Sequence, residues 1–384
     1  MKKKILVFAG FYLPGFKAGG PVRSLDGMVS QLGEFYDFWI ITSDRDLGDE
    51  KPYQEVLINH WQDVGHAKVF YVQRSSFGLR TIHRLVRECD PDFLYFNSFF
   101  DICFTIKPLL LWQIGFFSKK ITTVLAPRGE FAEGALAIKP FRKKVYLFVA
   151  KIIGLSRGIK WQATSQHEAH DVKQKVGATA DIRMASNLTS ICEYIPNEGN
   201  NRVAGILRIV CVARISPNKN ILEALKILSG VCCEVEFNLY GPIENLMYWR
   251  ECEDVIKTLP ENVKVSVHGE ISHEKINGTL RKYDLFFLPT AGENFGHAIF
   301  EAFRAGMPVL ISDLTPWRNL EEKGIGWDIG LEDENQFRKV IEKCAVMTEQ
   351  KYCKIQRNIH EFVREYSNDD KAVADYQALF KADK

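Results

Sequence analysis

The chain has 384 residues, of which 46% are hydrophobic and 26% are charged. This balance is typical of a folded globular protein and excludes a disordered or low-complexity chain, and the length predicts two or three domains. The formal net charge of +2 gives no general attraction to nucleic acid, so we expect no nucleic-acid partner. The charge is uneven: residues 1–200 carry 26 Lys and Arg against 20 Asp and Glu, whereas residues 201–384 carry 24 against 28. Two units with different partners are therefore expected.

The nine cysteines form no C-x-x-C pair, which favours reduced thiols in a cytoplasmic protein. The apolar run Ile5–Ala9 is too short for a signal peptide and predicts a first buried strand. No stretch reaches the roughly 18 uninterrupted apolar residues that a membrane span needs. We expect a cytoplasmic protein.

Short apolar runs alternate with amphipathic stretches along the first half, which is typical of βαβ units around a parallel sheet. The expected strands are Lys4–Ala9, Phe38–Thr42, Lys68–Val72, Phe93–Phe96, Thr122–Ala126 and Trp161–Thr164. Ser165 and Glu168 form a capping box that predicts the start of a helix.

The sequence becomes polar and rich in turn residues near Ile195–Asn201, which predicts a domain boundary. A second alternating series follows, with strands expected at Leu207–Arg214, Glu236–Tyr240, Val263–His268, Asp284–Pro289 and Pro308–Ser312. The tail from about Gln336 reads as helices. We therefore expect an α/β protein with an N-terminal domain at 1–198, a second domain at 199–365, and a C-terminal helix at 366–384 that crosses back to the first domain.

The segment from Phe286 to Val309 carries the strongest pattern. It predicts a buried strand, a loop containing Glu293, and a helix that begins near Gly296 and contains Glu301. Backbone N–H groups at a helix start can bind an anion, and carboxylates accept strong hydrogen bonds from sugar hydroxyls. This arrangement suits a nucleotide sugar; the alternative is an ordinary strand–loop–helix with two surface glutamates.

This segment resembles the E-x7-E block of retaining GT-B glycosyltransferases of family 4, at Glu293–Gly296, Glu301 and Ala305–Val309. Val212–Asn220 resembles that family's G-R-x-x-x-x-K segment, with Ala213 in place of the usual Gly. Further similarity lies at Tyr240–Pro242, Val267–Ile271 and Ser312–Arg318, and more loosely at Gly19–Gly20 and Ala126–Gly129. The resemblance implies a GT-B-like fold, with two Rossmann-like domains facing across a cleft.

The resemblance also implies roles for individual residues. Glu293 would contact hydroxyls of the donor sugar, and Glu301 would hold the ribose. Arg214 and Lys219 would bind the diphosphate of a UDP- or GDP-linked donor. Asn294, Phe295 and Gly296 would offer backbone groups to the sugar or phosphate. The segment of Gly269, Glu270 and Ile271 would border the nucleobase. The loop that contains Gly19 and Gly20 would approach the donor diphosphate and the acceptor.

Arg214 and Lys219 also have support from their positions, because ligands of open α/β sheets bind at the carboxyl ends of strands. Fixed cations there would stabilise charge that develops on a departing diphosphate. Two solvated surface charges are the alternative. On the acceptor side, Arg128 and Glu130 follow another strand end and could face the cleft, whereas Gly19–Gly20 could equally be a plain turn.

Residues 119–160 hold ten Lys and Arg and only two acids. Phe141, Val145, Phe148, Ile152 and Leu155 recur within them at helical spacing. A basic helix with an apolar stripe can lie on an anionic membrane surface. The alternative is a stripe that faces the core, with a solvated basic face.

The prediction is a metal-independent hexosyltransferase without a cofactor, which transfers a sugar with retention to a glycan or lipid-linked acceptor. The resemblance suggests bacterial surface-polysaccharide or lipopolysaccharide assembly, and it is compatible with an enzyme that is peripheral on the cytoplasmic face of the inner membrane. The resemblance implies a mechanism in which the departing phosphate itself takes the acceptor's proton. A nucleotide-sugar 2-epimerase and a non-catalytic sugar-nucleotide binding module remain as alternatives.

Overall fold

The computed structural model describes residues 2–118, 120–132, 135–136, 140–189, 205–367 and 370–381. The chain divides into two compact units: Met1–Ile191 together with Asp369–Lys384, and Cys192–Asn368. The boundary expected at residues 198 and 199 lies outside the described residues.

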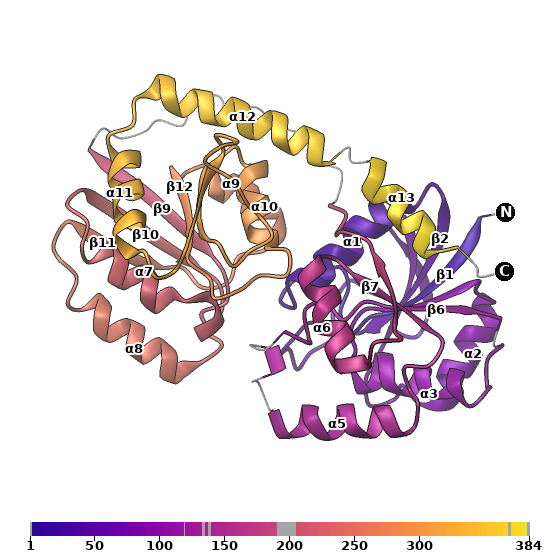
Figure 1. The fold of residues 1–384 in the computed structure, drawn as a ribbon. Coiled ribbons are helices and arrows are strands. Elements are labelled where there is room, and N and C mark those ends of the chain that lie inside the picture. Colours follow the sequence, from indigo (N-terminus) through magenta and orange to yellow (C-terminus); the bar gives the residue numbers. More distant parts are fainter. Residues whose placement is uncertain are drawn as a thin grey trace. The chain divides into compact units, whose positions relative to one another are not determined.

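The first unit is built on one eight-stranded sheet (Figure 1). In spatial order its strands are β3 (Trp61–Val64), β4 (Ala67–Val72), β2 (Tyr36–Ser43), β1 (Lys3–Phe8), β5 (Phe93–Phe96), β6 (Thr122–Leu125), β7 (Ile159–Ala163) and β8 (Asp181–Met184). All neighbours pair in parallel except β3, which runs antiparallel to β4. The six strands expected in this half are confirmed. The edge strands β3 and β8 were not expected, because both are short and largely unburied and lack a continuous apolar run.

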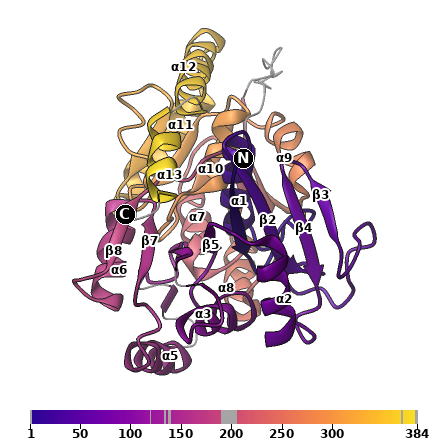
Figure 2. The same ribbon diagram turned by 90° about the vertical axis from the view of Figure 1, so that its right-hand side faces the viewer.

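Helices cover both faces of this sheet, and each face buries its own apolar cluster (Figure 2). They are α1 (Gly20–Leu32), α2 (Leu79–Cys89), the π-helix η1 (Ile102–Ile106), α3 (Lys107–Gln113), α5 (Pro140–Ile152), α6 (Gln166–Val176) and α13 (Asp370–Leu379). The hydroxyl of Ser165 accepts a hydrogen bond from the Glu168 N–H, which confirms the expected start of α6.

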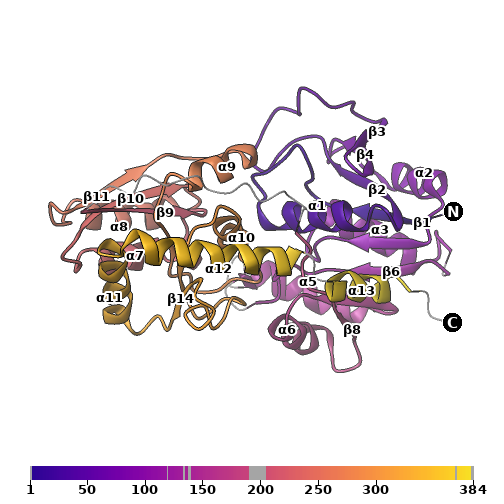
Figure 3. The ribbon, with the colours of Figure 1, turned by 90° about the horizontal axis from the view of Figure 1, so that it is seen from above.

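The C-terminal helix α13 packs on the first unit (Figure 3). Its Tyr376, Leu379 and the following Phe380 are buried with residues of β1 and β2. The Lys160 ammonium donates to the carbonyl of Lys381 at 2.7 Å. Residues near the end of the chain thus complete a core that residues near its start begin.

The second unit contains a six-stranded parallel sheet. In spatial order its strands are β11 (Val263–Val267), β10 (Glu234–Tyr240), β9 (Ile206–Val212), β12 (Leu285–Leu288), β13 (Val309–Ser312) and β14 (Gly326–Ile329). The five expected strands are confirmed, although β9 ends two residues before Arg214, and β14 was not expected. The chain order reverses between β9 and β12, and such reversals are where ligands bind in open α/β sheets.

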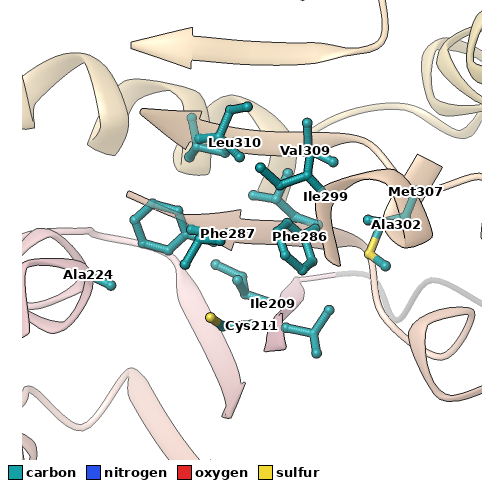
Figure 4. Close-up of a cluster of buried hydrophobic side chains, with 14 of the residues drawn as sticks. Ile209, Cys211, Ala224, Phe286, Phe287, Ile299, Ala302, Met307, Val309 and Leu310 are labelled. Carbon is teal, nitrogen blue, oxygen red and sulfur yellow. The ribbon is translucent and has the colours of Figure 1, made fainter. Parts of the chain in front are cut away.

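The helices of the second unit pack on this sheet and bury a single apolar cluster. They are the short 3-10 helix η2 (Pro217–Lys219), α7 (Ile221–Leu228), α8 (Leu246–Ile256), α9 (His273–Leu280), α10 (His297–Arg304), α11 (Glu334–Ala345) and α12 (Glu349–Ser367). Figure 4 shows how Ile299 and Ala302 of α10 approach Phe286 of β12 and Val309 of β13. Burial of one face of α10 fixes the helix start relative to the strand ends.

Candidate functional site

Two loops meet at the carboxyl ends of β9 and β12, which are adjacent strands. The Thr290 hydroxyl and the Ala291 N–H both donate to the carbonyl of Asn218, each at 2.9 Å. The Asn218 side chain in turn donates to the carbonyl of Gly292 at 3.2 Å. These bonds hold the loop after β12 against the loop after β9.

This arrangement brings Lys219 and Glu293 into direct contact. The Lys219 ammonium donates to a carboxylate oxygen of Glu293, and each side chain is only 14% exposed. The N–H of Glu293 donates to the carbonyl of Leu314 at 3.1 Å, which fixes its backbone to the loop after β13. Residues 74 positions apart in sequence thus form one charged pair at the point where the strand order reverses.

Helix α10 begins directly after this pair. Gly296 precedes it with φ 79° and ψ 59°, a left-handed conformation that a side chain would disfavour. The first N–H group that donates within the helix is that of Ile299, which bonds to the Gly296 carbonyl at 2.9 Å. The amides of the preceding turn therefore come before the first hydrogen bond of the helix. The Trp317 indole N–H donates to the carbonyl of Phe295, and the two rings lie 5.1 Å apart.

Glu301 lies inside α10 as expected, but its carboxylate pairs with Arg304 at 3.2 Å. Asn294 is partly buried between Glu293 and Phe295 in the same loop. Glu293, Asn294, Phe295 and Gly296 thus lie in one loop, and Glu301 lies in the helix that this loop enters.

Arg214 lies just beyond β9 and pairs with Glu244 at 2.7 Å, with about half of the arginine side chain exposed. A Cβ on Gly241 would overlap the carbonyl of Ala213, so the chain after β10 passes against the residue before Arg214. Gly241 also donates to the carbonyl of Gly269 at 2.7 Å. Gly269, Glu270 and Ile271 consequently lie at the same edge of the sheet as Arg214.

In the first unit, Gly19 adopts a left-handed φ of 67° and Gly20 begins α1. The loop before them is fixed by Asp46, whose carboxylate accepts the N–H groups of Phe16 and Lys17 at 2.7 and 3.0 Å. The sequence did not single out Asp46 for this role; an acid three residues after the end of β2 is the signal that could have found it.

Arg128 is held by three acceptors within the first unit. Its guanidinium donates to the side-chain oxygens of Asn97 at 2.7 Å and Asn187 at 2.5 Å, and to the Tyr95 hydroxyl at 2.7 Å. Tyr95 continues the network by donating to Gln162 at 2.6 Å. The Gln162 amide donates to the Tyr376 hydroxyl on α13, so Arg128 belongs to a polar network that anchors the C-terminal helix.

Glu130 caps a turn that follows β5. One of its oxygens accepts the Ser98 hydroxyl at 2.7 Å, and the other accepts the N–H groups of Phe99 at 2.6 Å and Phe100 at 3.3 Å. Burial raises the pKa of Glu130 above its ordinary value. Both acceptor-side candidates thus make internal bonds, and their contact with an acceptor stays a prediction.

Three residues that contact the predicted site residues or their loops were not identified from the sequence. Glu244 pairs with Arg214, Arg304 pairs with Glu301, and Thr290 joins the two loops. Only Arg304 has a sequence signal, namely its i,i+3 spacing from Glu301 on a helix. Among the described residues, no three His, Cys, Asp or Glu side chains are grouped as metal ligands, and no described helix is long and apolar enough to cross a membrane.

Residues 207–345 match the model of a family described as glycosyl transferases group 1. This stretch contains the two loops, the Lys219–Glu293 pair and α10. None of the curated proteins compared with the chain matches it in sequence.

Solved structures resemble the chain over nearly its full length. The Anabaena protein Alr3699/HepE, solved with UDP and glucose, has 18% identity and a TM-score of 0.67, covering 98% of each chain. Sucrose-phosphate synthase from Thermosynechococcus elongatus has 14% identity and a TM-score of 0.68, covering 99% of this chain and 98% of its own. The glycosyltransferase WaaG, described as involved in lipopolysaccharide biosynthesis, has 12% identity and a TM-score of 0.61, covering 98% of each chain. The fold of this chain is therefore that of the GT-B glycosyltransferases.

Proposed function

We propose that this protein transfers a sugar from a nucleotide-diphosphate donor to a hydroxyl of a glycan or lipid-linked acceptor, with retention of configuration. The observation that carries the proposal is the Lys219–Glu293 pair at the reversal between β9 and β12, directly ahead of the start of α10. A cation, a carboxylate and helix-start amides together match the phosphate and the hydroxyls of a sugar nucleotide.

Donor binding would exchange partners within this pair. The diphosphate takes the place of Glu293 beside Lys219, because its charge exceeds that of one carboxylate. Glu293 then accepts hydrogen bonds from the donor sugar hydroxyls. Lys219 thus keeps an anionic partner and the Glu293 carboxylate keeps hydrogen-bond donors, so neither group is left without a partner in the partly buried site.

Cleavage of the glycosyl–phosphate bond places negative charge on the departing diphosphate. Lys219 and Arg214 would stabilise this charge more in the transition state than in the bound donor. These two side chains supply the positive charge that the step requires, and we expect no metal requirement. Glu301 would hold the ribose, and the segment Gly269–Ile271 would border the nucleobase.

On the acceptor side, Gly19 and Gly20 would let the backbone approach the diphosphate and the acceptor. Arg128 and Glu130 act as positioning residues in the proposal, since their side chains hold the strand-end loops of the first unit. The departing phosphate takes the acceptor's proton as the new glycosidic bond forms. Surface-polysaccharide or lipopolysaccharide assembly is the expected setting.

The direct test is a thermal-shift screen with UDP, GDP and their sugars. A ligand that binds only the folded protein raises its melting temperature by an amount that grows with ligand concentration over Kd. We expect one nucleotide family to raise the Tm and the other to leave it unchanged. If neither does so at millimolar concentration, the protein does not bind a nucleotide sugar and the proposal fails.

The nucleotide sugar that binds is then incubated with and without acceptors, and the sugar is followed by NMR. Retention predicts that the anomeric configuration of the product equals that of the donor. Conversion of the donor to an epimer without any acceptor would instead identify a 2-epimerase. Binding without either reaction would identify a non-catalytic module.

A further inference from the structure

Helix α5 exposes a continuous apolar face. Its large side chains between 45% and 78% exposed are Phe141, Val145, Phe148, Val149 and Ile152. Their spacing of four, three, one and three residues places all of them on one side of the helix. A face of this kind on a described helix is unusual, because exposed apolar residues normally occur singly.

The opposite side of α5 is packed, so the exposure does not come from a helix that lacks contacts. The Tyr146 hydroxyl donates to the carbonyl of Phe99 at 3.2 Å, and Ala150 is buried. The Lys143 ammonium lies 5.0 Å from the centre of the Phe100 ring. The alternative that the stripe of Phe141, Val145, Phe148 and Ile152 faces the core is therefore wrong: Tyr146, Leu147 and Ala150 do so instead, and of the spaced residues only Leu155 is buried.

Further exposed apolar residues continue from the end of α5. Ile153 follows the helix, and Ile114 and Phe116 follow α3. The Gln113 side chain donates to the carbonyls of Leu155 at 3.1 Å and Arg157 at 2.8 Å, which ties the end of α3 to the segment after α5. Both helices lie at the same margin of the first unit in Figures 1 and 2.

The sequence that contains this face carries charges of one sign. Residues 134–160 contain seven Lys and Arg and no Asp or Glu. Arg142, Lys144, Lys151 and Arg157 are exposed. A second copy of the chain docked through the same face would bring these cations against each other, which disfavours self-association.

We propose that the exposed face of α5 docks the protein on an anionic phospholipid surface. The apolar side chains enter the boundary between headgroups and acyl chains, while the flanking cations contact lipid phosphates. An acid-free basic helix with Phe, Val and Ile on its open face matches such a surface in both respects. Docking does not depend on the proposed transfer reaction.

The contacts of α5 suggest what docking achieves, and this extension rests on the proposed function. Tyr146 and Lys143 contact Phe99 and Phe100, whose N–H groups are the ones that Glu130 accepts. A docked α5 would thus place the acceptor-side loop of the first unit next to the membrane. A lipid-linked acceptor would reach the enzyme from that surface.

Flotation of the full chain tests the proposal, with vesicles of phosphatidylcholine alone and vesicles of equal parts phosphatidylcholine and phosphatidylglycerol. We expect binding only to the anionic vesicles, and weaker binding at high salt. Phe148→Ser combined with Ile152→Ser should reduce binding at least tenfold, and each of Lys144→Glu and Lys151→Glu should reduce it about fivefold or more. All these positions are exposed, so the melting temperature should not change.

A matched control is Leu246→Ser with Met247→Ser, which removes two equally exposed apolar residues from α8 of the second unit. This variant should bind like the unchanged protein. Absence of vesicle binding, equal binding to neutral vesicles, or binding that survives the Phe148 and Ile152 changes would overturn the proposal. So would a concentration-dependent dimer that those two changes abolish, because the face would then join two copies. Flotation needs no nucleotide sugar, so its result is separate from that of the thermal-shift screen.

Discussion

Charged side chains lie at the carboxyl ends of the strands in both sheets, but those of the two units differ in how many side-chain and backbone partners they have. In the second unit, Lys219 and Glu293 hold each other through one contact, and Arg214 holds Glu244 in the same way. In the first unit, Arg128 donates to three side chains and Glu130 accepts three donors. Similar residue types at similar places in two sheets therefore have different numbers of partners.

The number of partners distinguishes side chains that can bind a ligand from side chains that stabilise the fold. A pair with one mutual contact can exchange that contact for a ligand at small cost. A side chain with three partners cannot turn to a ligand without leaving several partly buried polar groups unpaired, each of which costs about 1–3 kcal/mol. We therefore expect substitutions of the charged pairs of the second unit to affect activity, and substitutions of Arg128 and Glu130 in the first unit to affect stability.

The largest effect is expected for Glu293→Gln. The amide cannot provide the charged acceptor for donor hydroxyls, so kcat/KM should fall about 100- to 1,000-fold, as for removal of a transition-state contact. The melting temperature should change little. Glu223→Gln, which breaks an exposed pair with Lys226, is the matched control and should retain activity. If the Glu293 variant kept full turnover, the carboxylate of Glu293 would have no role in the reaction, and the contrast between the two units would fail.

Arg128→Met should act on stability instead. The change leaves the acceptors on Asn97, Asn187 and Tyr95 without their donor, and we expect the free energy of unfolding to fall by about 3 kcal/mol. Urea unfolding followed by circular dichroism measures this. Arg183→Met, at an exposed pair with Asp181, should cost less than about 1 kcal/mol. Equal stability of the two variants would contradict the structural role of Arg128.

Two glycines of the second unit sharpen the comparison within the candidate site. Gly241→Ala places a Cβ against the Ala213 carbonyl and should cost about 2 kcal/mol or more, with a displaced Arg214 and a raised KM for the donor. Gly269→Ala meets no atom within 4 Å and only strains a φ of 71°, so about 1 kcal/mol is expected. Thermal melts rank the two variants, and the reverse order would show that backbone strain outweighs the overlap.

The smallest effect is a pH dependence at Glu130. Burial raises the pKa of Glu130 in the folded protein above its ordinary value of 4.5. The folded state therefore holds this proton more tightly than the unfolded state, so the stabilisation is complete below pH 4.5 and is lost as the pH rises through the raised pKa. In Glu130→Gln this contribution should vanish. Urea unfolding at a series of acidic pH values gives the free energy of unfolding of the unchanged protein and of Glu130→Gln as a function of pH. Parallel profiles for the two proteins would show that burial of Glu130 does not contribute to the pH dependence.

The sequence predicted much of the second unit because its signals are local. A buried parallel strand is a short apolar run, and all five expected strands of this unit are present. The helix that begins near Gly296 and contains Glu301 was expected from the same segment and is present. Strands β3, β8 and β14 escaped, because their pairing with a neighbour, and not their own residues, makes them strands.

Side-chain direction was less predictable. The apolar stripe of α5 has a clear helical period, but period alone does not tell which side of a helix faces the core. The face chosen by packing is the one with Tyr146 and Ala150, which is the weaker pattern in sequence. In the same way, the sequence around Arg128 and Glu130 does not indicate that their side chains bond to groups within the first unit.

The sequence by itself determined the α/β class, the alternating order of strands and helices, and the loop-to-helix segment that carries Glu293 and Glu301. Each of these depends on interactions among residues within a few positions of one another. Tertiary structure alone decided that Lys219 meets Glu293, that Tyr376 closes the network of Arg128, and that α5 leaves its apolar face exposed. Those outcomes depend on groups tens to hundreds of residues apart, whose contact is fixed by the packing of whole elements and leaves no trace in local spacing.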